Sequence, residues 1–316
     1  MARKNYKHEM AYSDGWKKET GELPVTMTSD YLFRALLQAD EKTLKAMVAS
    51  LLHMRVSDIT DILITNPIVL GDAIDEKEFH LDVRVVLNGS MEVNLEMQVI
   101  KKPGFIDRTL LYVCRAFDQL SHGEDYVDAG SVVHIWFTDF TVFPEMPEFY
   151  STYKLINEKD VKKVYSDKIR ISHVDLTSVG LATDEDKRYG IDLWAQMFKC
   201  RTWEEIKMVA EKNHDVMDQA ISSVWLLTED EQIREQIRRR TAAEHEYQRM
   251  VDRISELEER NASLEERNAG LEERNASLVE RNAGLEEKNS RLEERNTNLA
   301  MENATLKNEL AGGKDQ

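Results

Sequence analysis

The sequence has few cysteines and no long apolar segment. Cys114 and Cys200 are the two cysteines among 316 residues. Such a number excludes a disulfide framework and favours buried free thiols in a reducing cytoplasm. No apolar run reaches the roughly 18 residues of a membrane span, and the N-terminal residues lack the apolar core of a signal peptide. We therefore expect a cytoplasmic protein with no membrane partner.

Several catalytic motifs are also missing. The chain has no Gly-rich phosphate loop, no Cys/His zinc spacing and no Gly-x-Ser-x-Gly element.

Its net charge is −17, of which residues 251–316 supply −6 and the rest −11. An acidic body is an awkward DNA binder, because neutralisation of phosphates supplies most non-specific affinity. Any nucleic-acid role must depend on a local basic patch, on bound cations or on several subunits.

Residues 79–98 predict a β-hairpin, because both arms alternate with period two. The apolar faces share one core only if paired positions have an even sum, near 178. An even sum excludes a two-residue turn at Asn88-Gly89 and predicts a loop of three or five residues, with a positive φ at Gly89. The apolar set is Phe79, Leu81, Val83, Val85, Leu87, Val93, Leu95, Met97 and Val99.

The other face of this hairpin places Asp82 opposite Glu96, with Gln98 beside them. Two carboxylates and a carboxamide on a rigid scaffold suit a divalent metal ion. The alternative is an ordinary polar outer face, since Asp and Glu are mostly exposed. It is weakened by the apolar neighbours of both acids, because a buried carboxylate is costly unless it is paired or metal-bound. His80 lies on the same face, although a satisfied or exposed histidine is the more ordinary interpretation.

The remaining pattern is a mixed α/β arrangement. Helices are expected from residue 30, from 44 to about 54, and over 105–120, the last with Leu110, Leu111, Cys114 and Phe117 inward. Strands are expected at 131–137, 149–155 and 169–176, and helices again over 184–240. Arg108 and Tyr112 fall on one stripe of the 105–120 helix with Arg115. This stripe could contact phosphates or form a solvated face.

The C-terminal region is a heptad repeat with leucine at every d position from Leu257 to Leu306. Asparagine fills the a positions from Asn261 to Asn303. Basic residues at g face mostly glutamates at e in a parallel, in-register pair, so we expect a parallel coiled-coil homodimer. Seven asparagines at a should make this coil weak for its length. A solvated single helix or a partly disordered repeat is the alternative.

Several of these segments together resemble the Rpn family of recombination-promoting nucleases, also called PD-(D/E)XK nuclease family transposases. The resemblance runs from about Asp30 to about Leu226. The segments that carry it are Ser29-Asp30-Tyr31-Leu32-Phe33-Arg34, Asn66-Pro67, Leu81-Asp82-Val83, Asn94-Leu95-Glu96-Met97-Gln98, Arg108-Thr-Leu-Leu-Tyr112, Gly123-Glu-Asp-Tyr126 and Ala195 to Trp203.

The resemblance implies a restriction-endonuclease-like core, a mixed sheet flanked by helices, that cuts DNA with Mg²⁺ or Mn²⁺. It makes Asp82 and Glu96 the metal ligands and puts Gln98 in place of the fold's usual lysine. A glutamine cannot act as a general base, so Gln98 could only orient the attacking water. Some nucleases of this fold add an acid from the first helix. Asp30, Asp40 and Glu41 are candidates, and we favour Asp30.

The sequence therefore predicts a metal-dependent DNA endonuclease linked to recombination or mobile DNA. The catalytic residues would be Asp82, Glu96 and Gln98, with Arg108 and Tyr112 on DNA. The rival is a non-catalytic oligomeric scaffold with a decayed nuclease core. The predicted parts are a flexible arm (1–26), the nuclease-like core (27–180), a helical region (181–245), the coiled coil (246–310) and a disordered tail (311–316).

Overall fold

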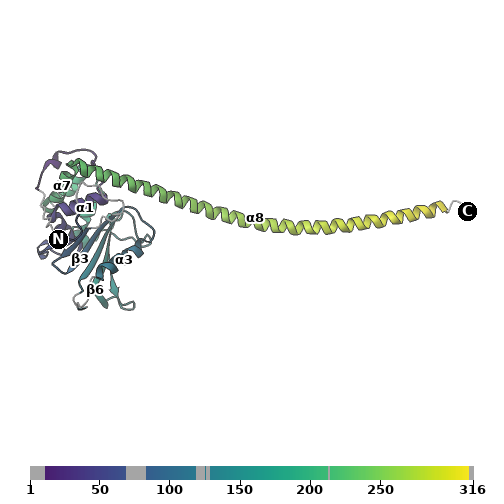
Figure 1. Ribbon diagram of the computed structural model, residues 1–316, viewed down its shortest axis with the longest axis horizontal. Coiled ribbons are helices and arrows are strands. Elements are labelled where there is room, and N and C mark those ends of the chain that lie inside the picture. The colour runs from purple at the N-terminus through teal and green to yellow at the C-terminus, as the bar shows by residue number, and fades with distance from the viewer. Residues whose placement is uncertain (1–10, 69–82, 119–124, 126–128, 213, 313–316) are drawn as a thin grey trace. The chain divides into compact units, whose positions relative to one another are not determined.

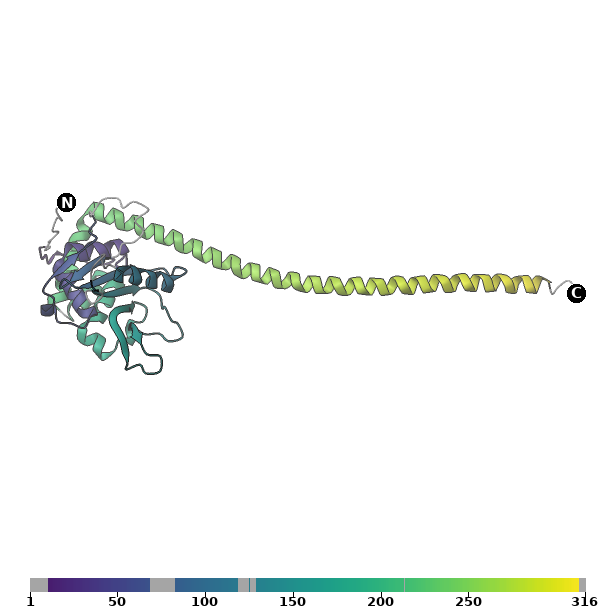
Figure 2. The same ribbon diagram turned by 60° about the horizontal axis from the view of Figure 1, so that its bottom comes forward.

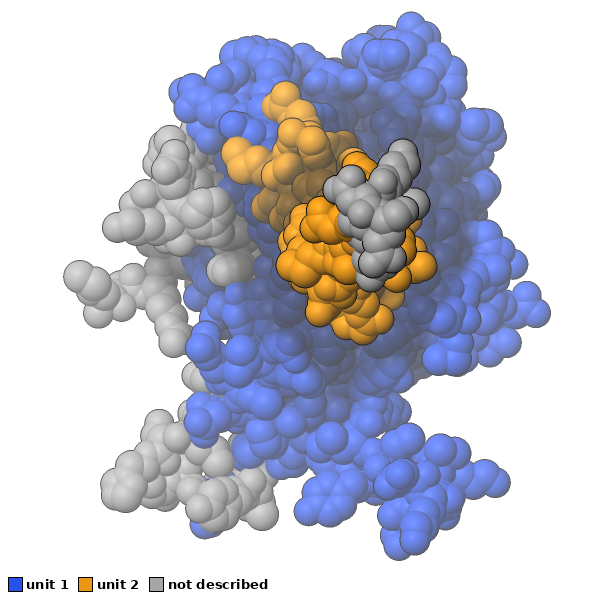
Figure 3. Space-filling model, turned by 90° about the vertical axis from the view of Figure 1, so that its right-hand side faces the viewer, with its two compact units in different colours: residues 1–247 blue, residues 248–316 orange. Residues whose placement is uncertain are grey.

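The computed structural model describes residues 11–68, 83–118, 125, 129–212 and 214–312. The chain divides into two compact units, residues 1–247 and 248–316, which Figure 3 colours separately. A mixed sheet flanked by helices occupies the first unit (Figure 1 and Figure 2), in agreement with the predicted fold class. The second unit is the greater part of one long helix, α8 (Glu231–Gly312). Among the described residues, no helix combines the length and the apolar character needed to cross a membrane.

The sheet has six strands in the order β1-β2-β3-β4-β6-β5. Antiparallel pairs join β1 to β2, β2 to β3 and β5 to β6, whereas β3, β4 and β6 are parallel to one another. Parallel neighbours need a crossover connection. The connection from β3 to β4 contains α3 (Phe105–Phe117), and the one from β4 to β6 contains β5. The strand bounds are β1 Ile62–Ile64, β2 Val83–Leu87, β3 Met91–Gln98, β4 Ser131–Thr138, β5 Tyr150–Ile156 and β6 Val164–Asp175.

The predicted hairpin register is confirmed for the described pairs. Val83 pairs with Leu95 and Leu87 with Met91, so paired positions sum to 178. Three residues, 88–90, form the loop, and Gly89 has a φ of 74°. The preceding Asn88 also has a positive φ, 50°. Asp82 and His80 lie outside the described residues.

One face of the sheet carries the apolar core. Val83, Val85, Val93 and Leu95 are buried there, and α1 (Asp30–Ala39) packs on β2 and β3. The other helices of this unit are α2 Glu41–Leu51, α4 Asp184–Tyr189, α5 Ile191–Lys199, α6 Trp203–Ala210 and α7 His214–Glu229, with 3₁₀ turns η1 Gly15–Lys18, η2 Val56–Asp58 and η4 Val179–Leu181. Phe33 of α1 packs against Phe137 and Phe198, with ring centroids 5.3 and 5.5 Å away.

The opposite face of the sheet carries polar and aromatic side chains and is covered in part by α3 (Figure 1). The predicted inward side of this helix is wrong, because Leu110, Leu111 and Cys114 are exposed. Phe105, Thr109 and Val113 are the buried residues instead. Phe105 packs on Trp136 at a centroid distance of 4.7 Å. The surface beneath the helix is aromatic and polar, so it accepts this mixed stripe rather than the leucines.

Part of the predicted N-terminal arm packs on the helical region. Trp16 is buried, and the Ser13 amide donates to Ser222 Oγ at 2.8 Å. The Leu23 amide donates to the Arg201 carbonyl at 2.8 Å. Gly15 lies so close to Trp225 that a Cβ there would be 2.4 Å from its ring. These contacts tie residues 13–23 to α6 and α7.

Candidate functional site

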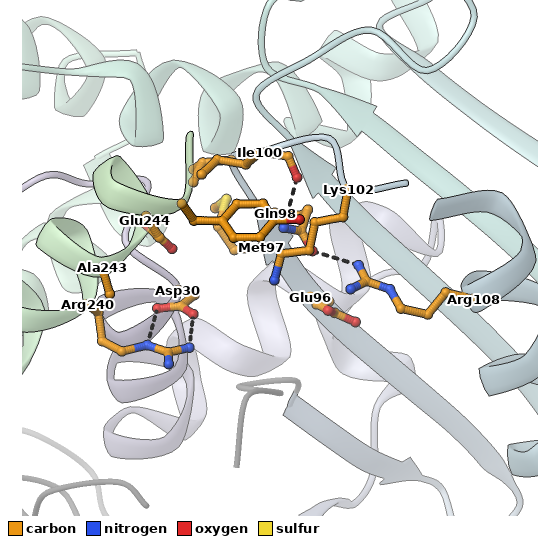
Figure 4. Close-up of a pocket in the computed structure, with 12 residues that line it drawn as sticks. Asp30, Glu96, Met97, Gln98, Ile100, Lys102, Arg108, Arg240, Ala243 and Glu244 are labelled. Carbon is orange, nitrogen blue, oxygen red and sulfur yellow. Dashed lines mark hydrogen bonds and ion pairs between the residues drawn. The ribbon is translucent and has the colours of Figure 1, made fainter. Parts of the chain in front are cut away.

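A pocket of about 110 Å³ opens at the C-terminal end of β3 (Figure 4). This volume is on the scale of a few water molecules. Asp30 of α1, Glu96 and Gln98 of β3, and Arg108 of α3 all line it. The hairpin alternation puts Glu96 and Gln98 on the same face, and the start of α1 brings Asp30 to the same end of the sheet. Elements distant in sequence thus contribute acid and amide groups to one pocket.

Glu96 is buried, with 6% of the residue exposed. Its Oε2 lies 3.9 Å from Nε2 of His134, which stands on the neighbouring strand β4. The Asn94 amide nitrogen lies 3.0 Å from His134 Nδ1. When that amide donates, the imidazole proton is on Nε2, the atom that faces Glu96. Burial, with the nearby charges of His173, Arg108 and Arg84, lowers the pKa of His134 to about 3, so this imidazole is neutral at pH 7.

Gln98 is held at both ends of its amide. Arg108 donates to its Oε1 at 2.6 Å, and its Nε2 donates to the Ile100 carbonyl at 3.0 Å (Figure 4). The Arg108 guanidinium lies over the Trp136 ring, 5.2 Å from the centroid. Arg108 therefore turns inward and fixes Gln98, instead of standing on a fully solvated stripe. Tyr112 also turns toward the sheet, with its ring 6.5 Å from that of His134.

The three candidate acids near α1 have different surroundings. Asp30 lines the pocket and makes a bidentate ion pair with Arg240, with Nη2 2.5 Å from Oδ2. Asp40 is fully buried and caps α2 through the amides of Lys42 and Thr43. Glu41 pairs with Lys45 at 2.8 Å on α2. Of the three, only Asp30 lines this pocket.

The first turns of α8 supply further lining that the sequence patterns did not indicate. Arg240, Ala243, Glu244 and Tyr247 line the pocket from this helix. Burial and the charge of Asp30 raise the pKa of Glu244 to about 8, so its carboxyl is mostly protonated at pH 7 and does not repel Asp30. No periodic or motif signal in the sequence connects residues 240–247 to the hairpin.

Two other contributors also escaped the sequence interpretation. Lys102 follows β3, and its Nζ lies 5.3 Å from the centroid of Tyr247. Burial and the charges of Arg108 and Arg240 lower the pKa of Lys102. The sequence did contain an indication for His134, because it is the one ionisable residue in the apolar run Ser131–Phe137. A polar residue in a doubly covered strand needs a partner.

The donor set fits a hard divalent cation in its chemistry, since carboxylate oxygens are the ligands such ions prefer. Within the described ranges, no three His, Cys, Asp or Glu side chains lie close enough together to hold a metal ion. Asp30, Glu96 and Glu244 are the described acids that line the pocket, and the predicted ligand Asp82 falls outside the described ranges.

Comparison with known proteins identifies a family for this chain. The family model for PD-(D/E)XK nuclease family transposases matches residues 27–254, which covers the sheet, the helices around it and the first turns of α8. No curated protein and no solved structure matches the chain. The match extends over more than half of the sequence, and so the chain belongs to the PD-(D/E)XK nuclease family transposases.

Proposed function

We propose that this protein is a divalent-metal-dependent DNA endonuclease that acts in recombination or on mobile DNA. The observation that carries the proposal is the convergence of Glu96, Gln98 and Asp30 on one pocket. Family membership supports a nuclease role linked to mobile DNA. The choice of Mg²⁺ or Mn²⁺, and the recombination role itself, are part of the proposal.

Asp82 and Glu96 are the proposed metal ligands, and Asp30 is the proposed additional acid. The register sum of 178, observed for residues 83–87 against 91–95, pairs position 82 with Glu96 if it continues by one residue. When bound, the metal would lower the pKa of its water and stabilise negative charge on the phosphate. Neutral His134 would leave the full negative charge of Glu96 available to the cation.

The chain's own residues would position the reactants. Gln98 would orient the attacking water through its amide, which Arg108 and the Ile100 carbonyl hold in one orientation. A fixed amide loses little entropy when the reacting geometry forms. Lys102 would add positive charge beside the scissile phosphate. The pairing of Arg240 with Asp30 would keep the acid in place at the rim of the pocket.

Plasmid nicking in the presence of Mg²⁺ tests the proposal. Wild type should convert supercoiled plasmid to the nicked form, whereas Asp82→Ala and Glu96→Gln should lose this activity. Glu92→Gln is the matched control, because Glu92 stands four residues earlier on the same face of β3. Equal nicking by wild type and both site variants would reject the site assignment.

The rival function is a non-catalytic scaffold, which the net charge of −17 favours. Calorimetry separates the two, since a working metal site should bind Mg²⁺ and lose this binding in Glu96→Gln. A scaffold with a decayed site would give no Mg²⁺ heat with either protein.

We also propose that the heptad region forms a parallel homodimer. In a parallel pair each g-position cation, such as Arg260, faces an e-position glutamate such as Glu265 of the second copy. An antiparallel pair would place g against g and e against e, and so juxtapose like charges. The d-position leucines are about half exposed in the single chain, from 43% at Leu257 to 50% at Leu306, and pairing would cover them.

A further inference from the structure

The hairpin of β5 and β6 concentrates positive charge in an acidic protein. Residues 153–170 contain six basic and three acidic side chains, while the whole chain carries −17. The hairpin forms an edge of the sheet, because β5 is the last strand in the order and, among the described strands, pairs with β6 alone. In Figure 1 it lies at the end of unit 1 away from α7.

The end of this hairpin exposes lysines and large apolar side chains together. Tyr165 is 88% exposed and Val161 69%. None of the ion pairs found in the described part of the chain involves the four exposed lysines of the hairpin, which are Lys154, Lys159, Lys162 and Lys163. Their charges are therefore available to an anionic partner.

The tip is an ordered turn. Asn157 Oδ1 accepts from the amides of Lys159 and Asp160, both at 3.0 Å. Asp160 Oδ1 accepts from the Lys162 amide at 3.1 Å. This bond turns the Asp160 carboxylate toward the backbone of the turn. Glu158 and Asp167 are exposed as well, so the six basic side chains outnumber the acids without standing alone. The register shifts between Lys154 and Ile156 bend and twist the ribbon, as β-bulges do.

Strand β6 runs from the tip of the hairpin to His173, which lies in one row across the sheet with Trp136 and Glu96. Glu96 pairs across the sheet with Trp136, and Trp136 with His173 of β6. Ten residues separate His173 from Lys163, which is roughly 33 Å of strand at 3.3 Å per residue. One turn of B-DNA is about 34–36 Å. The tip therefore lies at most about one helical turn of duplex away from His173, along the direction of β6.

From these observations we propose that the β5–β6 hairpin is the surface by which this protein holds duplex DNA. The lysines contact phosphates, and Tyr165 packs its ring against the duplex in or beside a groove, as β-ribbon readers and apolar wedges do. The inference depends on the proposed function for the identity of the substrate. An acidic chain can bind a polyanion in this way, because the positive charge that contacts the phosphates is concentrated on the hairpin.

Fluorescence anisotropy of a labelled duplex, with EDTA to prevent cleavage, tests the surface apart from catalysis. Lys162→Glu/Lys163→Glu should weaken binding about tenfold or more and reduce the slope of log Kd against log salt by about two. The matched control is Lys187→Glu/Arg188→Glu, which changes the charge equally at exposed positions of α4. Tyr165→Ala should weaken binding without changing the slope.

Equal weakening by the control pair, or unchanged binding of the hairpin variants, would overturn the inference. Binding of the wild type to vesicles of anionic lipid, with no binding to the duplex, would overturn it in favour of a membrane partner. If the wild type binds the duplex through the hairpin but does not nick plasmid, the binding surface is supported and the endonuclease proposal is rejected.

Discussion

The Arg108 guanidinium donates to Oε1 of Gln98 at 2.6 Å and lies over the ring of Trp136. This contact makes Arg108 a residue that acts through Gln98. If Arg108 contacts DNA, as the sequence suggested, its removal should raise KM. If it positions Gln98, its removal should lower kcat.

Arg108→Ala should lower kcat for plasmid nicking by about 10- to 100-fold with little change in KM, because a released Gln98 no longer presents one orientation. Arg108→Lys should restore only part of the rate, since an ammonium lacks the planar fork. Arg115→Ala, on the exposed side of α3, is the control. A rise in KM at constant kcat would instead identify Arg108 as a DNA contact.

Asp30 and Asp40 should respond in opposite ways to substitution. Asp40→Ala should lower the free energy of unfolding by about 3 kcal/mol, because the carboxylate caps α2 and accepts from Ser223 at 2.6 Å in a buried site. Asp30→Asn should lower stability by less than Asp40→Ala, because the amide keeps an oxygen that can accept from Arg240 in this largely buried pair, but it should reduce nicking. Urea denaturation and the plasmid assay measure the two effects. Unimpaired nicking by Asp30→Asn would remove Asp30 from the site.

Stability should fall as the pH drops below about 6.5. Burial lowers the pKa of His134 to about 3 and that of His173 to about 4. The unfolded chain therefore binds more protons than the folded chain between these values and the ordinary pKa of 6.5, and protonation favours unfolding. Each histidine should cost up to about 2 kcal/mol between pH 7 and pH 5. Urea midpoints at the two pH values measure this loss.

The variant His134→Gln/His173→Gln should show a smaller loss of stability between pH 7 and pH 5 than wild type. His245→Gln is the control, because this histidine is exposed on α8. An equal loss in the double variant and in wild type would assign the acid sensitivity to other groups.

Charge reversal should dissociate the proposed parallel dimer. Arg260→Glu/Arg267→Glu places like charges opposite Glu265 and Glu272 of the second copy, at about 0.3–0.5 kcal/mol for each contact, in a coil already weakened by asparagines. Light scattering should show a lower mass. Adding Glu265→Arg/Glu272→Arg restores attraction and should restore the dimer. A mass that is the same for wild type and the reversed variant would contradict this pairing.

Local patterns predicted much of the fold. Alternation over 79–98 predicted the hairpin register and the positive φ of Gly89, because a one-residue slip would expose every apolar side chain. Helices were predicted from residue 30 and from 44 to about 54, and the structure has α1 at Asp30–Ala39 and α2 at Glu41–Leu51. These features depend on neighbours within a few residues or on one pair of strands.

The orientation of α3 was not predictable in this way. Helical spacing at 105–120 offers two stripes, one with Leu110 and Leu111 and one with Phe105 and Thr109. The sheet surface under α3 decides which stripe is buried. It presents Trp136, His134 and His173, which pack against the stripe of mixed aromatic and polar residues. Helix periodicity reports that a helix has an apolar side, but the partner surface decides which side it buries.

The sequence by itself determined the register of the β2–β3 hairpin and the placement of Glu96 and Gln98 on one face of β3, since both follow from short-range spacing. Only the tertiary structure decided that Asp30, Lys102, Arg240 and Glu244 share one pocket with them. Asp30 lies on α1, Lys102 in the loop between β3 and α3, and Arg240 and Glu244 on α8. Contacts across such sequence distances form only when the sheet and its helices pack, because no local repeat links one element to another.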